Sequence, residues 1–315
     1  MPFTIRPYCG ADEGALLGLW NQTLVGDPIT PALFYTKVLL DPNFNPARLL
    51  LAKSGDALVG FVLGITRQVP LFLEGLQPEV AWVTAFGVHP AFRRQGVATE
   101  LFETLTAGLS VAGRRVLRIS PYVPNYFTPG VDCDAYPAAV HFLGKLGFAV
   151  TSEPVSMQLD LTGFRVPPEI ETLESRLSTQ AGITIAPLQS GDLPELMPFI
   201  ARHFGWEWWR HAQEYLLEQL GTGSDQVVFW VARRGAEIVG YCQMRRERFG
   251  PFGVLPELRG QGIGRALLVR CLASIRARGF HSAWFLWAEP EVQMLYRQLG
   301  FQVVRRWLIF ERSLP

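Results

Sequence analysis

A chain of 315 residues is longer than a single hydrophobic core usually supports, so its length predicts two domains. With 49% hydrophobic and 18% charged residues, its composition is typical of a globular protein and excludes an intrinsically disordered chain. A net charge of +1 argues against nucleic acid or a polybasic membrane contact as the main partner.

Strands and helices are mixed along the first half of the chain. A hairpin turn, SGD, joins two apolar segments, and a later strand runs directly into a glycine loop. In chain order we predict strands at residues 4–8, 48–53, 57–65, 81–88 and 155–161, and helices that begin near Asp12 and Gln95.

The second half repeats this order after a polar linker with a short helix at residues 169–178. We predict strands at residues 183–187, 226–233, 237–245, 249–254 and 307–311, and helices that begin near Asp192 and Gly262. Such mixing of strands and helices predicts an α/β fold.

The two halves are also alike in sequence. FGVHPAFRRQGVATELF (residues 86–102) and FGVLPELRGQGIGRALL (residues 252–268) share eight of 17 residues. TIRP and TIAP, and later KLGF and QLGF, match in the same order, so the chain contains two copies of one domain. The first copy carries a long loop, residues 121–135, that the second copy lacks, and loops of that length are often functional.

The glycine loop RGQGIGR (residues 259–265) lies between a strand and an amphipathic helix. Glycines there permit positive φ, and the first N–H groups of a helix form a site for phosphate or pyrophosphate. The spacing differs from the GxGxxG of dinucleotide-binding folds, and no Gly-Lys-Ser/Thr follows as in a P-loop.

This loop after a strand, with a later Tyr-x-x-Leu-Gly-Phe, resembles the GCN5-related N-acetyltransferase (GNAT) superfamily. The tandem layout is similar to that of mycothiol synthases. The resemblance implies two GNAT folds, each a mixed, mostly antiparallel sheet flanked by helices with a splayed central strand pair. It places the lobes at residues 1–162 and 182–315, with a linker at residues 163–181.

The resemblance implies acetyl-CoA as co-substrate, with its pyrophosphate on the loop and its pantetheine arm along the preceding strand. In the second copy the implied contacts are Phe252, Val254, Arg259, Gly260, Gln261, Gly262, Ile263, Gly264 and Arg265. In the first copy they are Phe86, Val88, Arg93, Arg94, Gln95, Gly96, Val97, Ala98 and Thr99.

The resemblance also implies a proton donor for the leaving thiolate at Tyr296, four residues before the glycine of LGF. Because the first copy has Leu143 there, we expect the chemistry in the C-terminal lobe, with Tyr126 or Tyr136 as substitutes in the first. Glu247, ahead of the splayed strand, is the candidate base, although an exposed strand-end carboxylate is the alternative interpretation.

An aromatic segment follows the first helix of the second copy, where the family builds its acceptor pocket. Trp206, Trp208 and Trp209 flank Glu207, and the group could meet an ammonium by charge and by cation–π attraction. Burial of these rings in the protein is the equal alternative.

The sequence therefore predicts an N-acetyltransferase that acts on the primary amine of a small molecule. A catalytically silent acyl-CoA-binding protein and a peptide or protein acetyltransferase remain open. The four cysteines form no CxxC pair and the five histidines no metal spacing, so we expect no metal. Without a signal peptide or a long apolar run, we expect a soluble, cytoplasmic monomer or homodimer.

Overall fold

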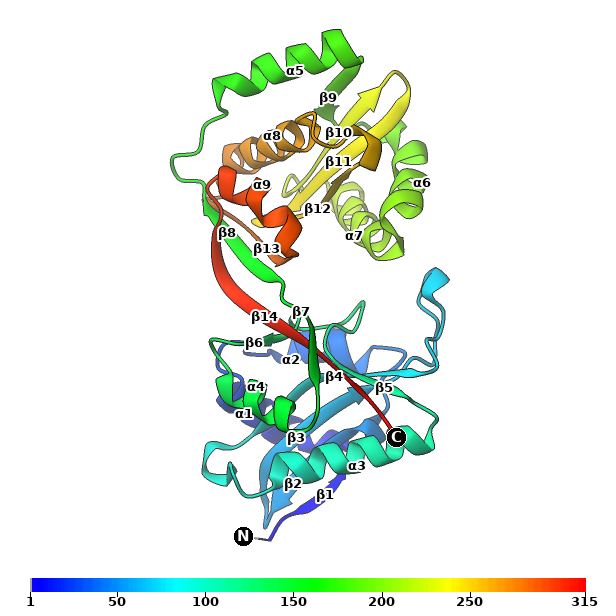
Figure 1. Cartoon of the computed structure of the whole chain (residues 1–315), viewed down its shortest axis with the longest axis vertical. Coiled ribbons are helices and arrows are strands. Elements are labelled where there is room, and N and C mark those ends of the chain that lie inside the picture. Colours follow the sequence, from blue (N-terminus) through cyan, green and yellow to red (C-terminus); the bar gives the residue numbers. More distant parts are fainter. Residues whose placement is uncertain (1) are drawn as a thin grey trace. The chain divides into compact units, whose positions relative to one another are not determined.

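The structure, a computed structural model, describes residues 2–315 and divides into two compact units. One unit runs to Pro154 and includes Arg305–Pro315, and the other is Val155–Val304. In each, helices flank a mixed, mostly antiparallel sheet, as the sequence predicts (Figure 1).

The first unit is built on the strand order β1-β2-β3-β4-β5-β14. Among the strand pairs described in this unit, the central pair β4–β5 alone is parallel. Apolar residues of α3 at i, i+4 and i+8 (Val97, Leu101 and Leu105) pack on one face of this sheet, and α1 packs on the other. Its elements are β1 (Thr4–Pro7), α1 (Glu13–Thr23), α2 (Pro31–Phe34), β2 (Leu49–Ser54), β3 (Ala57–Ile65), β4 (Val80–Val88), α3 (Val97–Val111), β5 (Val116–Ile119), β6 (Val131–Asp132), α4 (Pro137–Lys145), β7 (Ala149–Ser152) and β14 (Gln302–Ser313).

The second unit repeats the arrangement in the order β8-β13-β12-β11-β10-β9, and here β12–β13 is the parallel pair. The predicted linker helix is present and extends to 14 residues as α5. Its elements are β8 (Val155–Asp160), α5 (Pro168–Ala181), β9 (Ile183–Pro187), α6 (Leu193–Phe204), α7 (Trp206–Thr222), β10 (Val227–Arg234), β11 (Glu237–Arg245), β12 (Arg248–Val254), α8 (Ile263–Ala277), β13 (Ser282–Ala288) and α9 (Gln293–Gln298).

The units differ from the lobes expected at residues 1–162 and 182–315, because the copies exchange their closing strands. β14, the last strand of the second copy, pairs with β5 through Phe310 and Ile119, within the first unit. β8, the closing strand of the first copy, pairs with β13 through Leu159 and Ala283, within the second unit. Each copy thus completes the sheet of the other, because equivalent strands of a repeat fit either sheet.

Within residues 2–315, no helix combines the length and the apolar character that crossing a membrane requires. The same described residues hold no group of three His, Cys, Asp or Glu side chains arranged to bind a metal ion.

Candidate functional site

The first unit contains a cleft of about 1010 Å³ that opens where β4 and β5 separate. The two strands pair from Val80–Val116 to Val83–Ile119, and the N–H of Ser120 donates to the carbonyl of Val83 over 2.9 Å. Beyond Val83, β4 continues to Val88 and pairs only with β3. Its backbone groups on the β5 side therefore face the cleft, as in the splayed strand pair that the family resemblance implies.

The first glycine loop forms one end of this cleft. Gly96 has φ of +86° and stands immediately before α3, whose first N–H groups have no acceptor within the helix. Arg93 is held at the loop because its Nε donates to the carbonyl of Val88 over 3.2 Å. Arg93 and Arg94 both line the cleft. Unpaired N–H groups, a helix dipole and two guanidinium groups make this end suitable for a phosphate group.

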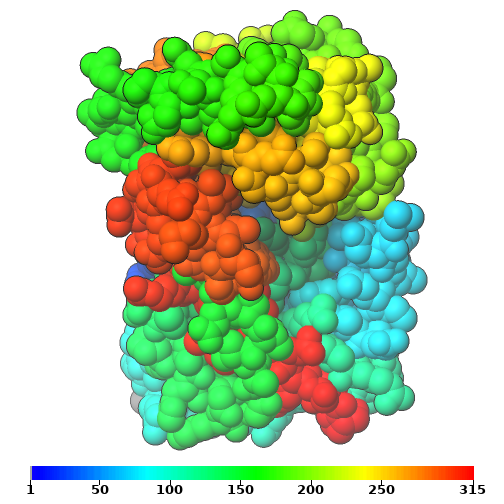
Figure 2. Space-filling model, turned by 45° about the horizontal axis from the view of Figure 1, so that its top comes forward, coloured from blue at the N-terminus to red at the C-terminus, as the bar shows by residue number. Residues whose placement is uncertain are grey.

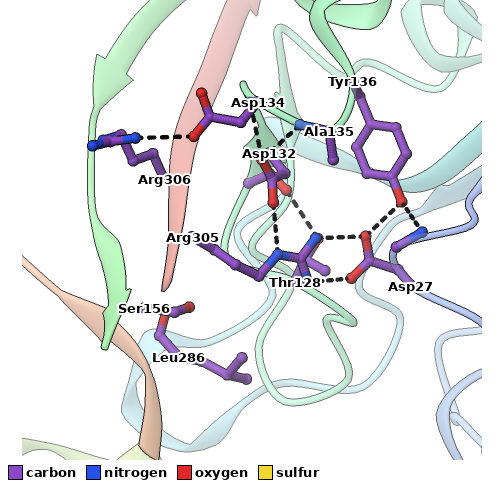
Figure 3. A network of polar contacts seen from close by, with 12 residues as sticks. Asp27, Thr128, Asp132, Asp134, Ala135, Tyr136, Ser156, Leu286, Arg305 and Arg306 are labelled. Atoms are coloured by element: carbon purple, nitrogen blue, oxygen red, sulfur yellow. Dashed lines mark hydrogen bonds and ion pairs between the residues drawn. The ribbon is translucent and has the colours of Figure 1, made fainter. Parts of the chain in front are cut away.

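The other end of the cleft is formed by the segment after α1 and by the start of α4. The hydroxyl of Tyr136 donates to Oδ2 of Asp27 over 2.8 Å and accepts from the N–H of Gly26 over 3.1 Å. Asp27 is also paired with Arg305 of β14, which lies between Asp27 and Asp132 (Figure 3). Burial, followed by the hydrogen bond to Asp27, raises the pKa of Tyr136, so its hydroxyl stays protonated at neutral pH.

The second glycine loop repeats the geometry of the first but is covered. Gly262 has φ of +91°, and Nε of Arg259 donates to the carbonyl of Val254 over 3.3 Å. A Cβ added to Gly262 would lie 2.9 Å from Cδ1 of Leu173 in α5, so this side chain rests on the loop. Figure 2 shows α5, in green, alongside the orange surface of α8. The space left beside the loop is about 430 Å³.

Aromatic rings occupy the region where β12 and β13 separate. Tyr296 is only 7% exposed, and its ring centroid lies 4.4 Å from that of Phe285 and 6.1 Å from that of Phe252. Burial raises the pKa of Tyr296. On β12, a Cβ added to Gly253 would lie 2.3 Å from the ring of Phe204.

In the first copy the residue against the equivalent glycine is much smaller. A Cβ added to Gly87 would lie 2.4 Å from the hydroxyl of Thr23, which lines the cleft. Thr23 ends α1 and Phe204 ends α6, so the two residues hold corresponding places in the two copies. The first copy is therefore open where the second is filled.

The structure distributes the predicted cofactor residues between these two regions. In the first unit Gln95 is not among the residues that line the cleft, and its amide donates to the carbonyl of Ala91. In the second, Phe252 packs on Tyr296, Ile263 is buried, and Gly264 lies near the ring of Phe252. The predicted residues that line the first cleft are Phe86, Val88, Arg93, Arg94, Gly96, Val97, Ala98 and Thr99, and those beside the second loop are Gly260, Gln261, Gly262 and Arg265.

The remaining predicted residues lie outside the large cleft. Glu247 is in the turn between β11 and β12, where its carbonyl accepts from the N–H of Trp284. Trp208 stacks on Phe204 at 5.1 Å and packs against the core of the second unit. Sequence reasoning missed Asp27 and Arg305, since their pairing joins residues 278 positions apart.

Comparison with known proteins agrees with this doubled fold. Residues 19–148 match a family model described as "Acetyltransferase (GNAT) family", and residues 225–303 match one described as "Acetyltransferase (GNAT) domain". The chain carries two GNAT acetyltransferase domains in tandem. This makes it an N-acetyltransferase, as the sequence predicts.

Relatives of this tandem acetyltransferase align with it over most of its length. The chain is 27% identical over 314 residues to a mycothiol acetyltransferase of Thermobispora bispora, covering 95% of this chain and 94% of that protein. It is 27% identical over 278 residues to a mycothiol acetyltransferase of Streptomyces coelicolor, covering 82% and 78%. A tandem GNAT protein from the clavulanic acid biosynthesis pathway shares the fold with a TM-score of 0.62 at 17% identity, covering 100% and 99%.

Proposed function

We propose that this tandem acetyltransferase transfers an acetyl group from acetyl-CoA to a primary amine of a small molecule, and that acetyl-CoA binds in the cleft of the first unit. The small-molecule acceptor is supported by the relatives, which are named mycothiol acetyltransferases. The proposed location of acetyl-CoA is supported by one observation: the first cleft is open, whereas the second glycine loop is covered.

The residues of the first cleft suit a long ligand with a charged end. The N–H groups at the start of α3, with Arg93 and Arg94, would hold the pyrophosphate. The backbone of β4 beyond Val83 has no strand partner on the side facing the cleft and would bond the pantetheine arm. Acetyl-CoA bound there supplies the thioester that an amine attacks.

The transfer forms a carbon–nitrogen bond and breaks the carbon–sulfur bond. The attacking neutral amine loses one proton and the departing thiolate gains one, so the amine proton balances the proton that the donor gives up. We assign the proton donation to Tyr136, because its hydroxyl is protonated at neutral pH and the residue lines the cleft. Leu143, which stands at the position that the family uses, cannot donate a proton. Tyr126 is not among the residues that line the cleft.

The sequence-based expectation of chemistry in the C-terminal lobe, with Tyr296 as the acid and Glu247 as the base, is the alternative location. The intact RGQGIG loop supports it, whereas Leu173, Phe204 and the rings around Tyr296 oppose it. A silent acyl-CoA-binding protein and a peptide acetyltransferase are the alternative functions.

Calorimetry with acetyl-CoA tests the location. Gly96→Glu and Gly260→Glu form a matched pair, because both glycines have positive φ, +86° and +78°, and open space where a Cβ would lie. We expect Gly96→Glu to weaken binding at least tenfold and Gly260→Glu to change it less than twofold. The reverse pattern would place acetyl-CoA in the second unit.

Product analysis by mass spectrometry tests the function. We expect the parent protein to acetylate small primary amines in preference to a lysine-containing peptide. Binding of acetyl-CoA without any acetylation would favour the silent protein, and preferred acetylation of the peptide would favour the peptide acetyltransferase.

A further inference from the structure

Positively and negatively charged side chains lie at different ends of the first cleft. Three cationic side chains line it, Arg93, Arg94 and Lys145, together with the imidazole of His141, and the single acidic one among the lining residues is Asp27. Asp27 contacts Tyr136 at the start of α4, whereas Lys145 ends that helix, about 13 Å further along its axis. The cleft thus has a basic end at the glycine loop and an acidic end at Asp27.

Asp27 is held in place from two directions. Its segment is fixed to α1, because the indole N–H of Trp20 donates to the carbonyl of Asp27 and the side chain of Asn21 bonds both the N–H and the carbonyl of Ile29. From β14, Nη1 of Arg305 donates to Oδ1 of Asp27 over 2.6 Å and Nη2 donates to Oδ2 over 2.9 Å. Among the residues that the structure describes, Oδ1 accepts this one bond, so it retains capacity for a second donor.

Arg305 does not neutralise this end of the cleft. Its Nε also donates to Oδ2 of Asp132 over 2.6 Å, so one guanidinium serves two carboxylates and the group keeps a net negative charge. Stacking on the Trp307 ring at 4.1 Å fixes the guanidinium plane, and its side chain is 25% exposed. In Figure 3 the neighbouring Asp134 is paired with Arg306, so that pair adds no net charge.

We infer that the Asp27 end of the cleft is the acceptor subsite, that it selects a primary amine without a carboxylate beside it, and that Arg305 is its positioning residue. This rests on the proposed function, in which acetyl-CoA occupies the basic end. An ammonium group is attracted to the open lone pair of Asp27, whereas an α-carboxylate would meet a like charge in a partly desolvated place. The second copy supplies the subsite with Arg305 through β14.

The test compares amines with the amino acids that differ from them only by the carboxylate. The pairs are tyramine and tyrosine, histamine and histidine, agmatine and arginine, and putrescine and ornithine, each assayed with acetyl-CoA on the full chain. We expect at least one amine to be acetylated with kcat/KM at least tenfold above that of its amino acid. Equal or reversed preference, or acetylation of none of the eight by protein that binds acetyl-CoA, overturns the inference.

Substitutions then assign the preference to these residues. Asp27→Asn has the same shape and should reduce the preference to less than threefold. Arg305→Lys should raise KM for the preferred amine at least tenfold and change the Kd for acetyl-CoA less than twofold. Arg306→Gln, on the same strand, removes an exposed ion pair and should change neither. If the preference survives Asp27→Asn, or Arg305→Lys lowers thermal stability without raising KM, the inference is wrong.

The experiments distinguish a failure of the acceptor inference from a failure of the proposed function. If the parent protein binds acetyl-CoA and Gly96→Glu abolishes the binding, but no preference among the pairs is found, only the acceptor inference fails. If acetyl-CoA does not bind in the first cleft, the proposed function fails.

Discussion

Leu173 of α5 rests on Gly262 of the second glycine loop, with Cδ1 2.9 Å from where a Cβ would stand. Beside it, Glu169 pairs with Arg265 over 3.0 Å, so a carboxylate lies where an anion would bind. A Cβ at Gly96, the matching glycine of the first copy, would meet nothing within 4 Å. The same loop motif is thus exposed in one unit and covered in the other.

Alanine substitution of Gly262 and of Gly96 should lower the stability of the protein by different amounts. Both glycines have left-handed φ, so alanine costs about 1–2 kcal/mol at either position. At Gly262 the contact with Leu173 adds about 1–3 kcal/mol of overpacking. We therefore expect Gly262→Ala to lower the urea midpoint clearly more than Gly96→Ala. Equal midpoints would show that Leu173 does not rest on the loop.

Removal of single phenol hydroxyls should distinguish the two proposed acids. Tyr136→Phe should lower kcat by about 10²–10⁴, since it removes the proton donor of the first cleft. Tyr296→Phe should leave kcat within threefold, because its ring is enclosed by Phe285 and Phe252. Steady-state kinetics at saturating acetyl-CoA would measure both, and the opposite result would restore the sequence-based assignment of Tyr296.

The sequence predicts most of the fold because its signals are local. The strands at residues 57–65 and 237–245 are found at those residues, and both glycine loops precede helices, because alternation, turns and glycines act over short distances. The exchange of β8 and β14 has no such signal. Both strands have the apolar pattern that each sheet requires. The sequence therefore does not show which strand joins which sheet, and the pairing is seen only in the folded structure.

The sequence predicts the candidate site less completely, because that site depends on contacts between distant residues. The motif predicts Arg93, Arg94 and Gly96 as site residues, and they line the cleft, whereas Asp27 and Arg305 become neighbours only through folding. Phe204 and Leu173 look like ordinary apolar helix residues in the sequence. Because they lie over Gly253 and Gly262, the second site is covered and the first is open. The identity of a residue alone does not show which glycine it will cover.

The ion pair of Asp12 with Arg6 should make stability depend on pH. Two bonds from Arg6, at 2.5 and 2.7 Å, and then one from the N–H of Cys9, hold the pKa of Asp12 well below its usual range. A lowered folded-state pKa stabilises the protein above the unfolded value of about 4, and this stability is lost as the pH falls.

Asp12→Asn should therefore lower the free energy of unfolding by about 1–3 kcal/mol at pH 7, with a difference that shrinks steadily below pH of about 4. Thermal melts of the parent and the variant between pH 7 and pH 2 would measure it. Glu103→Gln, at an exposed position of α3, is the control and should show no such convergence. A constant difference at all pH values would contradict the ion-pair explanation.

The contact of Gly130 with β14 should not tolerate a side chain. A Cβ at Gly130 would lie 2.4 Å from the carbonyl oxygen of Leu308, a backbone atom that cannot move without shifting the strand. We expect Gly130→Ala to lower the free energy of unfolding by about 1–3 kcal/mol. Gly144→Ala, in α4 with open space, should raise it by about 0.5–1 kcal/mol. Chemical denaturation of both would show whether β14 is held as closely as this geometry requires.

The insertion of β14 between β5 and β7 also sets the timing of folding during synthesis. When the ribosome has made the chain as far as Pro154, the first unit still lacks Arg305–Pro315. At about 5–20 residues per second, the missing strand is made about 8–30 s later. Throughout that interval β5 lacks the native neighbour of its outer edge, and Asp27 and Asp132 lack the guanidinium of Arg305. The first unit therefore cannot reach its native strand pairing, or complete the Asp27 end of its cleft, until β14 has been made.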